Sequence, residues 1–388
     1  MKNKTLQLIS TDNLKENKYL GKRNLGIDLL RMTAMFMVVI LHVLSRAGVL
    51  DATEPGSVNY ELSWLMRTFA LCAVNCYAII SGYVGWKSKH KYYKLVSMWL
   101  WVEFYQLIAA AIIGIFKIGD FSQDVILKTF LPVANGNYWY FSAYVGLFLF
   151  IPFLNKMIEK TDKTAFDKSF LCMFVFFCIF SPVYTTAFFN GTFGFIRGYS
   201  MIWLIVLYIV GGYLNKYSVA DKLSKRALLL IYNGSCTAGF VSRYILRGLS
   251  LLTNAKIKYE YMYVVDYTSF FVVIAAVSLV LLFAKTEIKS KRMKWLISTF
   301  SPVSFGVYLI HTQPLVWSLI QDKLSFIGSY FPVFMVLSVL GVAAAVFVLC
   351  SIMDYGRLHL FRVLKVDNFS KFIVKKISAV CLRKILKK

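Results

Sequence analysis

The stretch Gly26–Val43, GIDLLRMTAMFMVVILHV, decides how this chain is organised. Its apolar length predicts a membrane-spanning helix, although it contains Asp28, Arg31 and His42. Ionisable side chains are costly in hydrocarbon, so each one indicates a functional position with a partner. At about 100° per residue, Arg31 and His42 share one helix face, about three turns and 16 Å apart. Asp28 lies on the same face, three residues before Arg31.

The composition extends the apolar pattern over the whole chain. Of 388 residues, 58% are hydrophobic and only 16% are charged, whereas a soluble protein has about 25% charged residues. Recurring apolar windows therefore predict an all-α membrane protein of about ten transmembrane helices. The predicted spans are residues 26–48, 61–86, 95–116, 138–155, 169–189, 199–215, 227–247, 262–284, 295–320 and 329–353.

The basic residues predict the orientation of these spans. The net charge is +25, but the lysines and arginines lie in short loops and tails, which is typical of a membrane protein and not of a nucleic-acid-binding protein. Loops on one side hold 33 of the 44 Lys and Arg residues, loops on the other side hold 8, and 3 lie within spans. This asymmetry alternates without a break and predicts ten spans with both termini in the cytoplasm.

The chain accordingly divides into a membrane domain and two basic tails. Residues 1–23 are a cytoplasmic basic tail, residues 24–356 are the ten-span domain, and residues 357–388 form the second tail. In the second tail, KFIVKKISAVCLRKILKK spaces apolar residues at helical intervals among lysines. We expect a basic amphipathic helix on the cytoplasmic leaflet, and prefer a membrane anchor to a regulatory element.

Metal ions and permanently bound cofactors are not expected. The seven cysteines lie mostly in apolar spans, and Cys72 and Cys76 have no nearby His or third Cys to complete a zinc site. No Gly-x-Gly-x-x-Gly element follows a strand, and no phosphate-loop lysine motif is present. We assign no role to His90 or His359.

The residues of the first span suggest acid–base chemistry. An imidazole with a pKa near neutral can take a proton from a hydroxyl group that attacks an acyl carbon. Arg31, in the cytoplasmic half, could hold a phosphate of a long acyl-CoA whose arm reaches outward to His42. The alternative for His42 alone is a hydrogen bond between helices, but a shared face with Arg31 favours a site.

Three further polar positions are candidates for substrate binding. Ser81 closes the second span at the cytoplasmic face, where Gly82 could equally be a helix C-cap. Glu103 lies in mid-span and needs an arginine or a water-filled cavity beside it. His311, in the outer half of span nine, could bind the acceptor or carry a proton, with helix packing as the alternative.

Three arginines have simpler explanations. Arg67 and Arg243 lie near outer span ends, where snorkelling to the interface is the economical explanation and recognition of an anionic glycan carrier is the alternative. Asp354 and Arg357 flank the inner end of span ten and predict an i,i+3 ion pair in preference to a substrate contact.

Several stretches resemble the acyltransferase-3 family of integral-membrane O-acyltransferases. The first span carries an Asp, an Arg three residues later and a His after ten further residues, as the family's first helix does. The resemblance covers about residues 24–360. Similar elements are IDLLRMTAMFMVVILH (27–42), AIISGYV (78–84), YWYF (138–141), LIVLYIVGGYL (204–214) and SFGVYLIHTQPLVW (304–317).

The resemblance implies an acyl-CoA donor on the inner side and a carbohydrate hydroxyl, on a glycan or lipid-linked saccharide, at or beyond the outer side. It implies that His42 is catalytic, and that Arg31, supported by Asp28, binds the donor or sets its geometry. It also implies a bacterial cell membrane and, as partners, membrane lipids and polysaccharide-synthesis proteins. Some relatives have a soluble esterase-like domain after the spans, whereas this sequence continues only into a short basic tail.

Two other functions remain as alternatives. A polysaccharide or lipid-linked sugar exporter would also place polar residues near the midplane, but its two halves are often matched and inverted, and no matched halves are visible here. A peptide or small-molecule permease has no specific feature in its favour.

Overall fold

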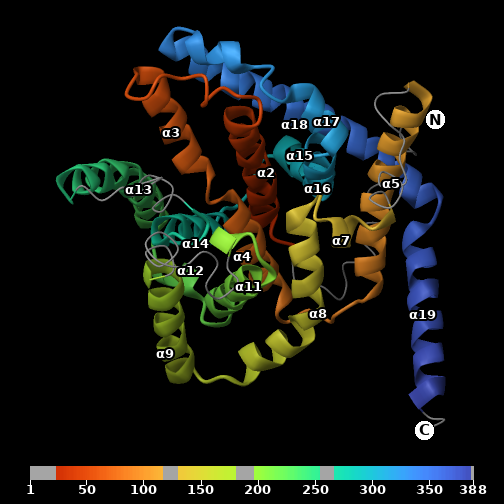
Figure 1. The fold of residues 1–388 in the computed structure, drawn as a ribbon. Helices are drawn as coiled ribbons and strands as arrows, with labels where there is room; N and C mark the ends of the chain where they lie inside the picture. The colour runs from red at the N-terminus through yellow and green to blue at the C-terminus, as the bar shows by residue number, and fades with distance from the viewer. Residues whose placement is uncertain (1–22, 117–129, 181–195, 254–265, 386–388) are drawn as a thin grey trace.

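The computed structural model describes residues 23–116, 130–180, 196–253 and 266–385, and in these residues it is all-helical, with no strand (Figure 1). The first 22 residues of the predicted N-terminal tail lie outside the described part. The α-helices are α2 (Leu25–Ser45), α3 (Val58–Ala70), α4 (Ala73–Gly85), α5 (Tyr93–Phe116), α7 (Pro132–Asn135), α8 (Trp139–Lys160), α9 (Lys163–Phe174), α11 (Met201–Lys216), α12 (Val219–Lys222), α13 (Lys225–Thr253), α14 (Phe270–Ala284), α15 (Lys291–Phe300), α16 (Ser304–His311), α17 (Pro314–Ile320), α18 (Pro332–Val363) and α19 (Val366–Ile385).

Within the described residues, five helical segments are long and apolar enough to cross a membrane, namely α2, α3 with α4, α5, α8 and α18. The segment from α15 to α17 is a sixth candidate if its 67° bend lies within one span. An all-helical fold with several membrane-length helices is therefore confirmed. The count of ten spans and the cytoplasmic termini stay predictions, and parts of spans 169–189 and 262–284 lie outside the described residues.

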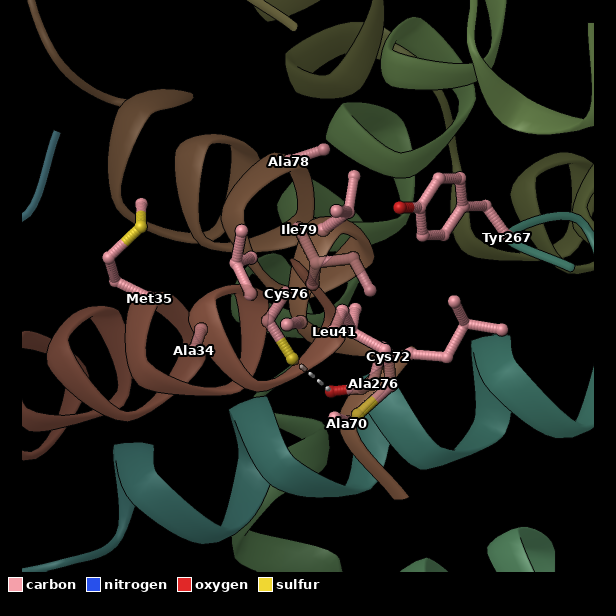
Figure 2. Close-up of a cluster of buried hydrophobic side chains, with 14 of the residues drawn as sticks. Ala34, Met35, Leu41, Ala70, Cys72, Cys76, Ala78, Ile79, Tyr267 and Ala276 are labelled. Atoms are coloured by element: carbon pink, nitrogen blue, oxygen red, sulfur yellow. Dashed lines mark hydrogen bonds between the residues drawn. The ribbon is translucent and has the colours of Figure 1, made fainter. Parts of the chain in front are cut away.

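Helix α2 lies inside the bundle and packs against α3, α4, α14, α15, α16 and α18 (Figure 1). Of its most apolar window, 61% is buried, against 22% for α18. Small side chains allow this close packing, as Figure 2 shows for Ala34 of α2, Cys76 of α4 and Ala276 of α14. The Cys76 thiol lies 3.8 Å from the Ala276 carbonyl oxygen. The ionisable residues of α2 are thus held on a helix surrounded by protein.

The N-terminal end of α2 is fixed by two neighbouring residues. The Asn24 side chain accepts a hydrogen bond from the Ile27 amide as the N-cap and donates one of 2.8 Å to the Ala284 carbonyl. A Cβ at Gly26 would lie only 2.0 Å from the Phe283 carbonyl oxygen. Glycine is therefore required where α2 begins against the end of α14, one turn before Arg31.

Helices α4 and α11 meet through glycines. A Cβ on Gly82 would lie 1.9 Å from the Tyr208 carbonyl oxygen, and a Cβ on Gly211 would lie 2.0 Å from the Ile79 carbonyl oxygen. Such glycines let two helix backbones approach closely. Because α4 continues to Gly85, the alternative that Gly82 is a helix C-cap is wrong; Gly82 is a packing residue.

A break separates α16 from α17 directly after His311. Pro314 has no amide hydrogen and begins α17, and the Gln313 side chain caps the new helix by accepting from the Leu315 amide at 2.5 Å. The break produces the 67° bend and leaves His311 at the end of a helix that packs against α2.

The C-terminal segment forms α19, which runs beside α5 (Figure 1). Ser97 of α5 donates a hydrogen bond of 2.8 Å to Asp367 of α19. The position of α19 on a membrane leaflet stays a prediction.

Candidate active site

At the N-terminal end of α2, one buried carboxylate binds two arginines. Asp28 accepts 2.5 Å hydrogen bonds from Nη1 of Arg31 and from Nε of Arg23. The Arg31 side chain is 31% exposed and makes no other hydrogen bond with the described residues. Two arginines against one carboxylate leave a net positive site with unused N–H donors.

Near the C-terminal end of the same helix, His42 contacts His311. Nδ1 of His42 lies 2.8 Å from Nε2 of His311, and Nδ1 of His311 lies 2.5 Å from the Val307 carbonyl oxygen. The indole of Trp317 meets His42 edge-on at 5.4 Å, and the Arg46 guanidinium lies 4.3 Å above the same indole. His42 therefore lies between a second imidazole and an aromatic ring.

Tyrosines line the region next to Arg31. The Tyr77 hydroxyl donates to the Arg31 carbonyl oxygen, and the Tyr77 ring is 6.3 Å from that of Tyr140, which stacks on Tyr144 at 6.4 Å. The Tyr140 hydroxyl is buried and has no hydrogen-bond partner among the described residues. Ser81 donates to the Tyr77 carbonyl at 2.9 Å. These groups form a polar, aromatic wall made by α4 and α8.

The helix that carries His311 is anchored from two sides. The Tyr138 hydroxyl donates a 3.0 Å hydrogen bond to the Leu309 carbonyl. On the other side, a Cβ on Gly306 would lie 2.0 Å from the Asp354 carboxyl carbon, so α16 rests directly on this side chain. The position of the His311 imidazole thus depends on contacts from α8 and α18.

Asp354 is fully buried and saturated with donors. Arg357 donates to it through Nε and Nη2, both at 2.8 Å, which confirms the predicted i,i+3 ion pair. Trp101 Nε1 and the Tyr105 hydroxyl donate at 2.9 and 2.7 Å. The Arg357 guanidinium also lies 3.7 Å above the Trp101 ring. We interpret this cluster as structural.

The remaining candidate residues do not contact the histidine pair. Glu103 is buried on α5, and neither carboxyl oxygen has a hydrogen-bond partner among the described residues, so the arginine expected beside it is not found there. Arg67 lies half-buried on α3, with its guanidinium 5.4 Å from the Trp64 ring.

Arg243 corrects an expectation of the sequence. Only 6% of its side chain is exposed, and Nη1 lies 3.4 Å from a carboxyl oxygen of Glu61 on α3. The guanidinium also lies 4.3 Å above the Trp64 ring. The snorkelling explanation is therefore wrong for Arg243, which joins α13 to α3 inside the protein because an ion pair and aromatic faces replace water around its charge.

Sequence reasoning missed the aromatic part of the site. Trp317 stands six residues after His311 in the stretch that resembles the family signature, and that proximity was the available signal. For Tyr77 and Tyr140 the sequence offers only aromatic residues in spans, which are also typical of packing. Among the described residues, no group of three or more His, Cys, Asp or Glu side chains is arranged to hold a metal ion.

Comparison with known proteins gives one match. A family model described as an acyltransferase domain matches residues 24–353, from the N-cap of α2 into α18. No curated protein and no solved structure matches the chain.

Proposed function

The chain belongs to the acyltransferase-3 family, and from this premise we propose that it is a membrane O-acyltransferase acting on carbohydrate. The donor is acyl-CoA, with acetyl as the expected acyl group. The acceptor is a sugar hydroxyl of a cell-envelope polysaccharide or exopolysaccharide, and the enzyme works in a bacterial cell membrane. The observation that carries the proposal is the shared face of α2, with a net positive site at one end and a histidine pair at the other.

The cytoplasmic end of α2 suits the anionic head of acyl-CoA. Arg31 has free N–H donors, Arg23 adds positive charge, and Asp28 orients both arginines. Phosphate oxygens accept strong, charge-assisted hydrogen bonds from such guanidinium groups. About 16 Å along the helix lies His42, a separation suited to an extended pantetheine arm. The Tyr77, Tyr140 and Tyr144 rings offer that arm an aromatic wall.

The proposed reaction uses His42 as general base. The acceptor hydroxyl oxygen forms a bond to the thioester carbonyl carbon while His42 takes the hydroxyl proton. The carbon–sulfur bond then breaks, and the thiolate of CoA recovers that proton from the imidazolium. The products are an O-acyl sugar and free CoA. Because the proton returns to the leaving group, the protein ends each cycle unchanged.

Mass analysis of the surface polysaccharide tests the proposal in cells. Polymer from cells with the protein is expected to carry an acyl mass increment that is missing from cells without it. His42→Ala should give the unmodified mass at normal protein level, with His90→Ala as a matched histidine control that keeps the increment. The same spectra identify the acyl group and the sugar residue.

The exporter alternative predicts a different result. If His42→Ala stopped the appearance of polymer outside the cell, instead of its acylation, the protein would be a transporter and the proposal would be wrong. Normal acylation in His42→Ala would also contradict it.

A further inference from the structure

The hydrogen bonds around His311 determine which nitrogen of His42 can act as the base. A backbone carbonyl oxygen can only accept, so the 2.5 Å contact with Val307 requires that Nδ1 of His311 carries a hydrogen. A neutral imidazole has one donor and one acceptor nitrogen. Nε2 of neutral His311 is then an acceptor, and the hydrogen in the 2.8 Å contact must come from Nδ1 of His42. Nε2 of His42 is left with a free lone pair.

Both imidazoles are expected to be neutral at rest. His311 is 3% exposed, and no carboxylate is hydrogen-bonded to either ring among the described residues. Among the described residues, the Trp317 indole and the Tyr308 ring contact the pair, and the charged group beside them is the Arg46 guanidinium, which lies against Trp317. A buried imidazolium beside an arginine and without an anion would be costly. The cationic alternative, in which His311 donates to His42, is therefore unfavourable.

We propose that His311 is a positioning residue that holds His42 in the Nδ1-protonated form and so directs the Nε2 lone pair at the acceptor hydroxyl. This inference rests on the proposed function, because it assigns a direction to the proton transfer suggested there. When His42 takes the proton on Nε2, its Nδ1–H still donates to His311, which stabilises the transient imidazolium. A neutral imidazole thus performs the orienting role that a carboxylate has in a serine-protease triad.

The local structure explains why His311 can hold this orientation. Its side chain bonds to the carbonyl of its own helix one turn earlier, and that helix ends at the Pro314 break. Tyr138 holds the Leu309 carbonyl, and Asp354 fills the space at Gly306. One contact therefore fixes the imidazole on α16, and two further contacts fix α16 against Tyr138 and α18, all independent of substrate. Partners that orient metal-binding histidines typically contribute about 10- to 100-fold to affinity or activity, and we expect an effect of similar size from the partner of His42.

Two substitutions at His311 separate positioning from packing. His311→Leu keeps an apolar side chain but removes the acceptor, so kcat is expected to fall about 10- to 100-fold, with little change in the KM for acetyl-CoA. His311→Gln keeps an amide oxygen that can accept from Nδ1 of His42, and should recover much of the lost kcat. Equal activity of both variants at equal folded amounts would contradict the proposal, as would a loss confined to KM.

Nitrogen NMR reads the protonation pattern directly and does not depend on activity. The chain has only four histidines. In a double variant with His90→Gln and His359→Gln, ¹⁵N-labelled histidine therefore gives signals from His42 and His311 alone. We expect a protonated Nδ1 and an unprotonated Nε2 for both rings. A protonated Nε2 on His42 would overturn the inference. If His42→Ala kept full activity, the proposed function itself would fail, whereas an active His311→Leu would remove only the positioning role.

Discussion

Two Asp-x-x-Arg pairs, one on α2 and one on α18, have the same spacing and opposite surroundings. Asp354 receives four hydrogen bonds, is 0% exposed, and has a partner arginine that is 4% exposed. Asp28 receives one hydrogen bond from each of two arginines, and Arg31 is 31% exposed with unused donors. A pair whose hydrogen bonds are all made within the protein can only stabilise the fold. A pair whose arginine keeps unused, partly exposed donors can also bind a ligand. The difference lies in the neighbours and not in the motif.

Substitution in the saturated Asp354–Arg357 pair is expected to lower the stability of the fold more than any other change proposed here. Arg357→Leu leaves the buried Asp354 carboxylate without its cation, and breaking a buried pair in this way costs about 3–5 kcal/mol. Thermal unfolding of the purified protein in detergent should show a strongly lowered midpoint, while Arg362→Leu, at an exposed position of the same helix, should not. A stable Arg357→Leu protein with a raised KM for acyl-CoA would make this pair a binding site instead.

Substitution in the unsaturated Asp28–Arg31 pair should weaken binding of the acyl-CoA donor more than it lowers the stability of the fold. Arg31→Gln removes charge-assisted hydrogen bonds worth about 1.5–3 kcal/mol, so the KM for acetyl-CoA should rise about 10- to 100-fold. Arg23 still pairs with Asp28, and the unfolding midpoint should change little. The matched control is Arg226→Gln, an exposed arginine in the first turn of α13. An unchanged KM would remove the proposed donor site from this end of α2.

Gly306→Ala tests whether the Asp354–Arg357 pair helps to set the position of His311, because Gly306 lies on the same helix as His311 and packs against Asp354. The new methyl group would overlap the Asp354 carboxylate, and overpacking of this kind costs about 1–3 kcal/mol. We expect a lower unfolding midpoint and a lower kcat, because α16 carries His311. Gly341→Ala on α18 is the control, since a Cβ there meets nothing within 4 Å. If kcat stayed normal in Gly306→Ala, the contact with Asp354 would not set the position of His311.

The smallest effect is expected at Arg23. Its side chain is 42% exposed, and exposed ion pairs contribute about 0–1 kcal/mol. Arg23→Gln should therefore leave the unfolding midpoint almost unchanged and raise the KM for acetyl-CoA less than Arg31→Gln does. A larger KM effect at Arg23 would make it the principal contact of the donor.

Local sequence predicts some of these features and not others. Helical periodicity places Arg31 and His42 on one face of α2, and an i,i+3 spacing predicts the pair of Asp354 with Arg357. Their environments depend on residues far away in sequence. Trp101 and Tyr105 saturate Asp354 from about 250 positions away, and no local pattern indicates such donors.

Long-range contacts also decide the roles of the isolated polar residues. His42 and His311 are 269 positions apart, and each was a candidate by itself, but their hydrogen bond and its direction required the fold. Position near a span end suggested that Arg243 reaches water, and its contact with Glu61 was not visible from that position. Sequence periodicity therefore predicts the individual spans but does not determine how the spans pack against one another.

The most direct test of His42 as the general base is to measure acyl transfer by the purified protein. The membrane-reconstituted enzyme is supplied with acetyl-CoA and with glycan isolated from cells that lack it, and free CoA thiol and acylated glycan are measured together. If His42 is the general base, the native protein should form both products in equal amounts. His42→Ala, folded to the same extent, should form them at least about 100-fold more slowly. Equal rates for the native protein and His42→Ala would contradict the claim that His42 is the base.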